Sequence, residues 1–258
     1  MRLPLIWPRK QKPEPLVPLE PLLKDYPLYD PPHKVEERVL PREQALENFD
    51  YFLRVRHERV AYLTNWMREK FGATLTPDQQ GVAAMNRWMV QYGGLLLPSQ
   101  TVENSYFSYD PPWTGEGAGC NVVFDLATAF GEFLITNCPN LHWEMGPMPE
   151  SYSKSQFKEM KADFGSSFQR QEIRGFKLRR WAVTPHHYLW MYAMDLQDVM
   201  TSAPSQKFFG PSGAYHEQFT HRLEREFAQR LERYRKPDAF YQGPAPEDTE
   251  EEGSDERL

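Results

Sequence analysis

The sequence has few of the residues that mark the common kinds of functional site. It holds two cysteines in 258 residues, Cys120 and Cys138, which is too few for the ligand set of a structural zinc site. The two bracket a predicted helix, along which they stand on the order of 25 Å apart, far beyond the roughly 7 Å between Cα atoms that a disulfide allows. Both thiols are therefore expected to be free.

Long apolar runs are missing as well. No run approaches the roughly 18 to 20 residues that cross a bilayer. The start, MRLPLIWPRKQKPEP, has a short apolar patch broken by Pro4 and Pro8, and lacks the small-residue cleavage site of a secretory signal. These absences favour a cytoplasmic protein that does not contact membranes.

Most of the chain also lacks an excess of charge of one sign. The formal net charge is −6, and residues 244–258 account for all of it, with seven acidic residues and one arginine. The other 243 residues hold 29 basic and 29 acidic side chains. Because a neutral body lacks the basic field that attracts phosphates, binding of nucleic acid is not expected.

Proline is abundant instead, and its distribution divides the chain. Ten of the 23 prolines fall within residues 1–41, and proline removes backbone donors and disfavours helix, so this segment is predicted to be an extended arm. Its apolar side chains indicate that the arm lies across the body or engages a partner. Residues 42–236 are predicted to form a single globular domain, and the acidic residues 237–258 a disordered tail.

Helical periodicity fills most of the body. It predicts one helix from Pro41 to about Phe71, and a second that is capped by Thr76 and ends at Gly93, so that the two form a helical hairpin. Two more helices are expected, one opened by Thr184 and Pro185 and one over residues 213–235. A short strand is predicted at 106–109.

The best-patterned segment is PPWTGEGAGCNVVFDLATAFGEFLITNCPNLHWEM, residues 111–145. Asn121 is the predicted cap of its helix, and Gly131 neither caps nor ends it, so a neighbouring backbone is expected to approach there. The alternation in 141–145 predicts a strand, with an antiparallel partner in 170–181. The predicted fold is mainly α (α+β), with a helical hairpin and amphipathic helices around a central helix and a small antiparallel sheet.

Asp125 and Glu132 are the candidate functional carboxylates. They lie seven residues apart on the polar face of the central helix, about 10 Å along its axis. Paired carboxylates can perform acid–base chemistry; the structural alternative is that each caps, bonds the glycine-rich lead-in, or pairs with an arginine from 174–180. His142 and Trp143 on the following strand, and Trp113 in the lead-in, complete the candidate set.

The remaining motifs give no metal or cofactor site. The pairs His186/His187 and His216/His221 lack the i, i+4 spacing that chelates a metal on a helix. The run WTGEGAG lacks the Lys-Ser/Thr of a phosphate loop, and no cofactor is expected. A candidate basic patch with an aromatic residue, of the kind that grips single strands, consists of Lys177, Arg179, Arg180 and Trp181.

The helix with Ala127-x-x-x-Gly131-Glu132, followed by a Trp-bearing strand, resembles small bacterial domains of unknown function in which a G-x-x-x-G-E helix packs beside a short sheet. Ala127 stands at the place of the first glycine. Several of those domains are similar to immunity or accessory proteins encoded near bacterial toxin and secretion loci. The resemblance implies a bacterial protein that binds another protein, and it carries over no catalytic residues.

Three functions follow from these observations. The leading hypothesis is a soluble protein-binding protein without catalytic activity, because no catalytic constellation is recognisable and the chain is rich in Trp, Tyr and Met, which are enriched at interfaces. The second is an enzyme, a hydrolase with Asp125 and Glu132 in a cleft between the central helix and the sheet. The third is a homo-oligomeric structural protein.

Overall fold

The computed structural model describes residues 17–98, 108–146, 168–177, 181–201 and 219–236. The fold is mainly α with a small two-stranded antiparallel sheet, which confirms the predicted fold class. In chain order the elements are α1 (Glu20–Leu23), η1 (Glu37–Val39), α2 (Arg42–Phe71), α3 (Gln79–Tyr92), η2 (Gly93–Leu95), η3 (Gly115–Gly117), α5 (Gly119–Asn137), β1 (His142–Met145), β2 (Gln171–Arg174), α7 (Pro185–Thr201) and α9 (Arg222–Arg235).

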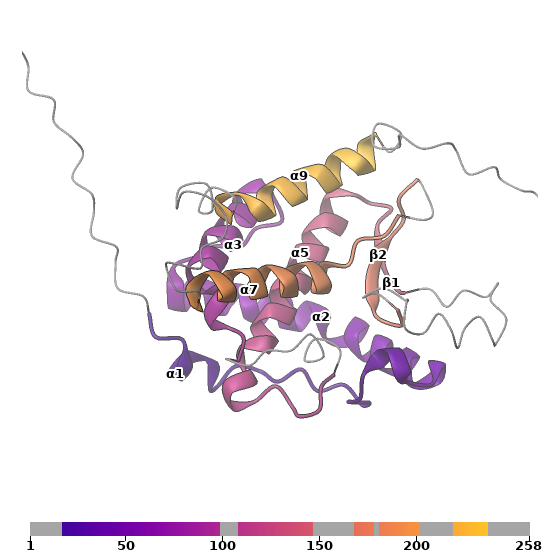
Figure 1. Cartoon of the computed structure of the whole chain (residues 1–258). Helices are drawn as coiled ribbons and strands as arrows, with labels where there is room; N and C mark the ends of the chain where they lie inside the picture. The colour runs from indigo at the N-terminus through magenta and orange to yellow at the C-terminus, as the bar shows by residue number, and fades with distance from the viewer. Residues whose placement is uncertain (1–16, 99–107, 147–167, 178–180, 202–218, 237–258) are drawn as a thin grey trace, which may run out of the picture.

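The central element is α5, which contacts α2, α7 and α9 (Figure 1). A helix that is apolar on nearly all sides is stable only when it is covered on all sides, and 15 of the 19 residues of α5 are buried. By length and composition, residues 115–137 could cross a membrane, contrary to the expectation that no run is apolar enough, yet 89% of an apolar 18-residue window within them is buried inside the fold. The core helices of globular proteins pass the same test.

The helices α2 and α3 follow one another in the chain but have different main neighbours. α2 lies against α5, while α3 lies against α9, and the two meet through aromatic side chains at the end of α2. Gly72 ends α2 in the left-handed conformation, with φ of 64°. The prediction that Thr76 caps α3 is wrong. The cap is Asp78, whose side chain accepts hydrogen bonds from the Gly81 N–H at 2.9 Å and from the Thr76 hydroxyl at 2.7 Å.

The sheet pairs β1 with β2 in antiparallel register, so that Trp143 lies opposite Ile173. An isolated bridge joins Ile173 to Val183 and leads the chain into α7. Ser108 and Tyr109, from the strand predicted at 106–109, are not in a strand; residues 106 and 107 lie outside the described residues. Cys120 and Cys138 are buried and free, as predicted.

Residues 17–41 lie across the body of the domain and are part of its core (Figure 1). Tyr26 and Tyr29 are buried, and the Tyr29 N–H donates to Asn121 Oδ1 at 2.7 Å. Asn121, predicted to cap α5, therefore holds this segment, and its Nδ2 donates to the carbonyls of Trp113 and Ala118. The arm thus packs on its own domain from residue 17 onward. Residues 1–16 and the acidic tail lie outside the described residues.

Candidate functional site

Asp125 belongs to a fully buried ion pair. Arg59 Nε donates to Asp125 Oδ1 at 2.6 Å and Arg59 Nη2 to Oδ2 at 3.0 Å, while the Tyr26 hydroxyl donates to Oδ2 at 2.8 Å. The rest of the guanidinium bonds the carbonyls of Pro27 and Leu28. All polar groups of this cluster are thus used to join the N-terminal segment to α2 and α5.

Burial and the ion pair act in opposite directions on these groups. Burial raises the pKa of the Asp125 carboxyl, and Arg59 and the hydrogen bonds from Arg59 and Tyr26 oppose that rise. Burial lowers the pKa of the Arg59 guanidinium, but Asp125, together with Tyr26 and Tyr29, more than offsets this and the pKa is raised overall. Such a pair is costly to break, because either partner alone is an uncompensated buried charge.

Glu132 is held by a different arginine, in a different part of the core. Its Oε1 accepts from Arg56 Nε at 3.0 Å and from the indole N–H of Trp143 at 2.8 Å, so it connects α5 to α2 and β1. Both carboxylates therefore pair with arginines of α2, which corrects the expectation that the partner comes from 174–180. Among the described residues, they bind separate sets of groups and share no hydrogen-bonding partner.

The other candidates of this region divide between core and surface. Trp143 and Trp113 are buried, and Trp113 packs against Tyr109 with ring centroids 5.0 Å apart. His142 points to the exposed side of β1, where its Nε2 lies 3.4 Å from Glu144 Oε2. The structure therefore does not bring His142 together with Asp125 and Glu132.

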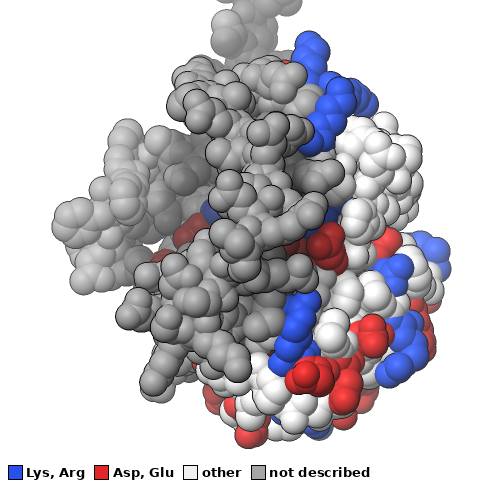
Figure 2. Space-filling model, turned by 90° about the vertical axis from the view of Figure 1, so that its right-hand side faces the viewer, with Lys and Arg blue, Asp and Glu red and all other residues white. Residues whose placement is uncertain are grey.

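The candidate basic patch is only partly described. Lys177 is exposed, Trp181 is half-buried with the Arg233 guanidinium 5.0 Å from its ring centroid, and Arg179 and Arg180 lie outside the described residues. On the face shown in Figure 2, basic and acidic side chains alternate over the coloured surface. The visible surface thus has the mixed charge that the neutral body predicts.

A buried histidine, His186, lies beside Trp143 and two phenylalanine rings of the core. His186 packs on Phe52, Phe124 and Trp143, and its Nε2 lies 3.0 Å from Thr128 Oγ1. Because the Thr128 hydroxyl donates to the Phe124 carbonyl, its oxygen is left to accept from His186 Nε2. Burial, and to a lesser extent Arg170, lowers the pKa of His186 well below its usual value, so the ring is neutral.

A metal site finds no support in the described ranges, where no group of three or more His, Cys, Asp or Glu side chains is placed to hold an ion. A groove of about 640 Å³ lies beside the end of α2 and along α3. It is lined by Val17, Phe71, Gly72, Ala73, Thr74, Thr76, Gln80, Ala84, Arg87, Trp88, Gln91 and Tyr92.

Three aromatic rings give this groove a rigid wall. Trp88 stacks on Tyr92 with centroids 5.2 Å apart, and Phe71 meets both rings edge-on or tilted, at 5.4 and 5.0 Å. The row continues into the core through Trp66 and Tyr26. Trp88 and Tyr92 are buried and Phe71 is half-buried, so the rings are fixed in place and Phe71 is the most accessible of the three.

One end of the groove already holds a segment of the chain itself. Val17 lines it, and the Val17 backbone N–H donates to the Tyr92 hydroxyl at 3.2 Å. Since Val17 precedes Pro18, its backbone is biased toward an extended or polyproline conformation. Polar groups, including the exposed Arg87 and Gln91, form the rim. The groove therefore already contacts the backbone of a residue that precedes a proline.

Comparison with protein-family models, with curated proteins and with solved structures finds no match for this chain. Sequence reasoning missed the groove because Phe71, Trp88 and Tyr92 read as core positions of two separate helices. The one available signal was the proline-rich, apolar segment that includes Val17.

Proposed function

We propose that the protein binds another protein by taking up an extended, proline-containing segment of that partner in the groove between α2 and α3. The observation that carries the proposal is the Val17–Tyr92 contact, in which the backbone N–H of a residue before a proline already donates to a tyrosine that lines the groove. Recognition of proline-rich segments by aromatic grooves is an established mode, because such segments are extended before binding and lose little entropy.

Charge narrows the class of partner segment. Arg87 is the one charged residue among the described residues that line the groove, and it is exposed. An acidic side chain in the partner segment complements it, and such a pair contributes to the rate and specificity of binding. The preferred ligand is therefore a proline-containing segment with at least one Asp or Glu.

This proposal keeps the leading expectation of an accessory or immunity-like protein that acts by binding. The hydrolase hypothesis has less support from the geometry. Asp125 uses both carboxylate oxygens on Arg59 and Tyr26, and Glu132 uses Oε1 on Arg56 and Trp143. Those contacts give both carboxylates a role in holding helices together.

A displayed library of random peptides, selected on the full chain, tests the proposal. We expect the selected peptides to contain proline and an acidic residue, and Arg87→Glu to weaken their binding about tenfold, which corresponds to about 1.4 kcal/mol. Arg54→Glu is the matched control, because it reverses an exposed arginine on α2 about 25 Å along the helix from Phe71. If no selected peptide loses more affinity with Arg87→Glu than with Arg54→Glu, the proposal is refuted.

A further inference from the structure

A second cavity, of about 310 Å³, lies where α7, α9 and the segment before α7 meet over Phe130 of α5. Phe130 is fully buried, and the Tyr188 ring stacks beside it with centroids 6.3 Å apart. Val183 and Met191 add further apolar surface. A cavity with apolar walls and a few polar groups is the usual form of a small-molecule site.

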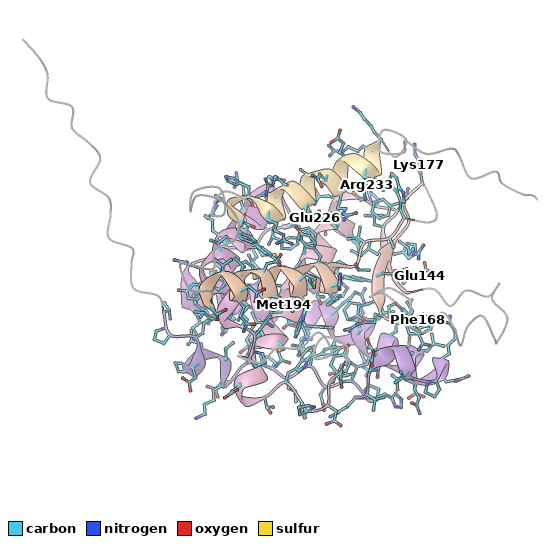
Figure 3. All side chains as sticks on the ribbon, viewed as in Figure 1. Glu144, Phe168, Lys177, Met194, Glu226 and Arg233 are labelled. Carbon is cyan, nitrogen blue, oxygen red and sulfur yellow. The ribbon has the colours of Figure 1, made fainter. Side chains whose placement is uncertain are left out.

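Two side chains of opposite charge line this cavity. Glu226 and Arg230 lie one turn apart on α9, and Figure 3 shows Glu226 on α9, next to α7. Arg230 Nε donates to Glu226 Oε1 at 2.6 Å, and Arg230 Nη2 contacts the same oxygen. Within the part of the chain that the structure describes, Glu226 Oε2 and Arg230 Nη1 therefore have no protein partner.

We propose that this cavity binds a small zwitterion with an apolar side chain, namely an apolar α-amino acid. Its ammonium group donates to Glu226 Oε2, its carboxylate accepts from Arg230 Nη1, and its side chain packs on Phe130 and Met191. The site is independent of the groove between α2 and α3, with which it shares no lining residue.

The charge balance of the cavity selects a zwitterion over simpler ions. Glu226 and Arg230 form a neutral pair, so a ligand of zero net charge adds no uncompensated charge to a partly buried site. A carboxylate alone is repelled by Glu226, and an amine alone is repelled by Arg230. Both charges of the ligand are needed for the full interaction.

The size of the cavity agrees with this class of ligand. At roughly 30 Å³ for each water in the liquid, its volume corresponds to about ten waters. An amino acid with a branched aliphatic or phenyl side chain occupies a similar space.

Titration calorimetry of the full chain with L-phenylalanine tests the proposal. We expect saturable binding, and binding at least about tenfold weaker, or about 1.4 kcal/mol, for 3-phenylpropanoate and for 2-phenylethylamine, which each lack one charge. Absence of L-phenylalanine and L-leucine binding would overturn the proposal. So would equal binding of 3-phenylpropanoate, which would indicate a plain anion site.

Variants on α9 locate the site. Glu226→Gln and Arg230→Gln are each expected to weaken L-phenylalanine binding about tenfold. Glu232→Gln and Arg235→Gln, at exposed positions of the same helix, are expected to leave it unchanged. Ala182→Leu fills the cavity without altering the charges, and is expected to abolish binding in a chain whose circular dichroism matches that of the parent. Unchanged affinity in Ala182→Leu and Arg230→Gln would place the ligand elsewhere and refute the assignment.

Discussion

The indole ring of Trp143 occupies the space that a Cβ atom at position 131 would need. An ideal Cβ on Gly131 would lie 2.3 Å from Cζ2 of Trp143, and the indole N–H donates to Glu132 Oε1 at 2.8 Å. The adjacent glycine and glutamate of α5 therefore act together, one as a recess for the ring and the other as its hydrogen-bond acceptor. This contact gives a physical account of the Gly-Glu pair and the Trp-bearing strand that the sequence places close together.

Gly131→Ala is expected to destabilise the protein. Alanine favours a helix by up to about 1 kcal/mol over glycine, but overpacking a filled core costs about 1–3 kcal/mol, so we expect a net loss of about 1–2 kcal/mol. Urea unfolding measures it. Gly117→Ala is the control, because a Cβ there meets nothing within 4 Å. Equal stability of Gly131→Ala and the parent would show that the ring is not fixed against α5.

Asp125→Asn should have a larger effect, because it leaves the Arg59 charge buried without its partner. We expect a loss of about 3–5 kcal/mol in the free energy of unfolding. Replacing both partners, as Asp125→Leu with Arg59→Met, is expected to cost less than Asp125→Asn alone, since no charge is then stranded. Glu47→Gln, whose contact with His33 lies at the surface, should change stability by less than about 1 kcal/mol. A double variant as unstable as the sum of the single variants would contradict this account.

Neither thiol is expected to react in the folded protein. Burial raises the pKa of Cys120 to about 12 and also raises the pKa of Cys138, and the thiolate is the reactive form. We expect no labelling by a thiol-specific disulfide reagent at pH 8 in native buffer, and labelling of both cysteines in urea. Rapid labelling of the native chain at Cys120 would show that α5 opens easily.

The mainly α fold was predictable from the sequence because its signals are local. Apolar periodicity and terminal signals located α2, which ends at Gly72, and the start of α7 at Pro185. The caps of α3 and α5 were predicted wrongly, because the Thr76 hydroxyl donates to Asp78 two residues further on, and Asn121 bonds Tyr29, which only the tertiary structure brings near. At Gly131 a close approach was expected from backbone, and the structure places a side chain there.

The groove and the arginine partners of Asp125 and Glu132 could not be predicted, because they depend on contacts between residues that are far apart in the chain. Arg59 and Asp125 are 66 residues apart in the chain, and Val17 and Tyr92 are 75 apart. A single sequence shows that a carboxylate is on a helix but not which of many arginines will meet it. The spacing of Asp125 and Glu132 on one face suggested a shared site, whereas α2 supplies a separate arginine to each.

Tyr92→Phe tests whether the Val17 contact holds the N-terminal segment on the groove. Loss of the hydroxyl removes the acceptor of the Val17 N–H, and a single hydrogen bond contributes about 0.5–1.5 kcal/mol. We therefore expect a small loss of stability and faster protease cleavage near Val17. Tyr62→Phe is the matched control, because the exposed Tyr62 hydroxyl has no hydrogen-bond partner among the described residues. Identical cleavage of the two variants would show that the Tyr92 hydroxyl does not hold the N-terminal segment on the groove.

His186 should make the protein less stable in mild acid. Its pKa in the folded state is lowered well below the usual value, mainly by burial, whereas the unfolded chain takes up a proton near pH 6.5. Below about pH 6.5 the unfolded state therefore binds more protons than the folded state. The free energy of unfolding is not reduced by His186 above that pH, and it falls as the pH is lowered further, by at most about 1.4 kcal/mol per pH unit.

The free energy of unfolding, measured at pH 7.5 and pH 5.5, separates this contribution from those of other groups. His186→Phe keeps an aromatic ring among Phe52, Phe124 and Trp143 and leaves the Thr128 hydroxyl bonded to the Phe124 carbonyl. We therefore expect the variant to lose less stability than the parent between the two pH values. His142→Gln, at an exposed position, should lose as much as the parent. If His186→Phe and the parent lose the same amount, then the buried imidazole is not the group that excludes the proton, and the acid sensitivity comes from other titrating groups.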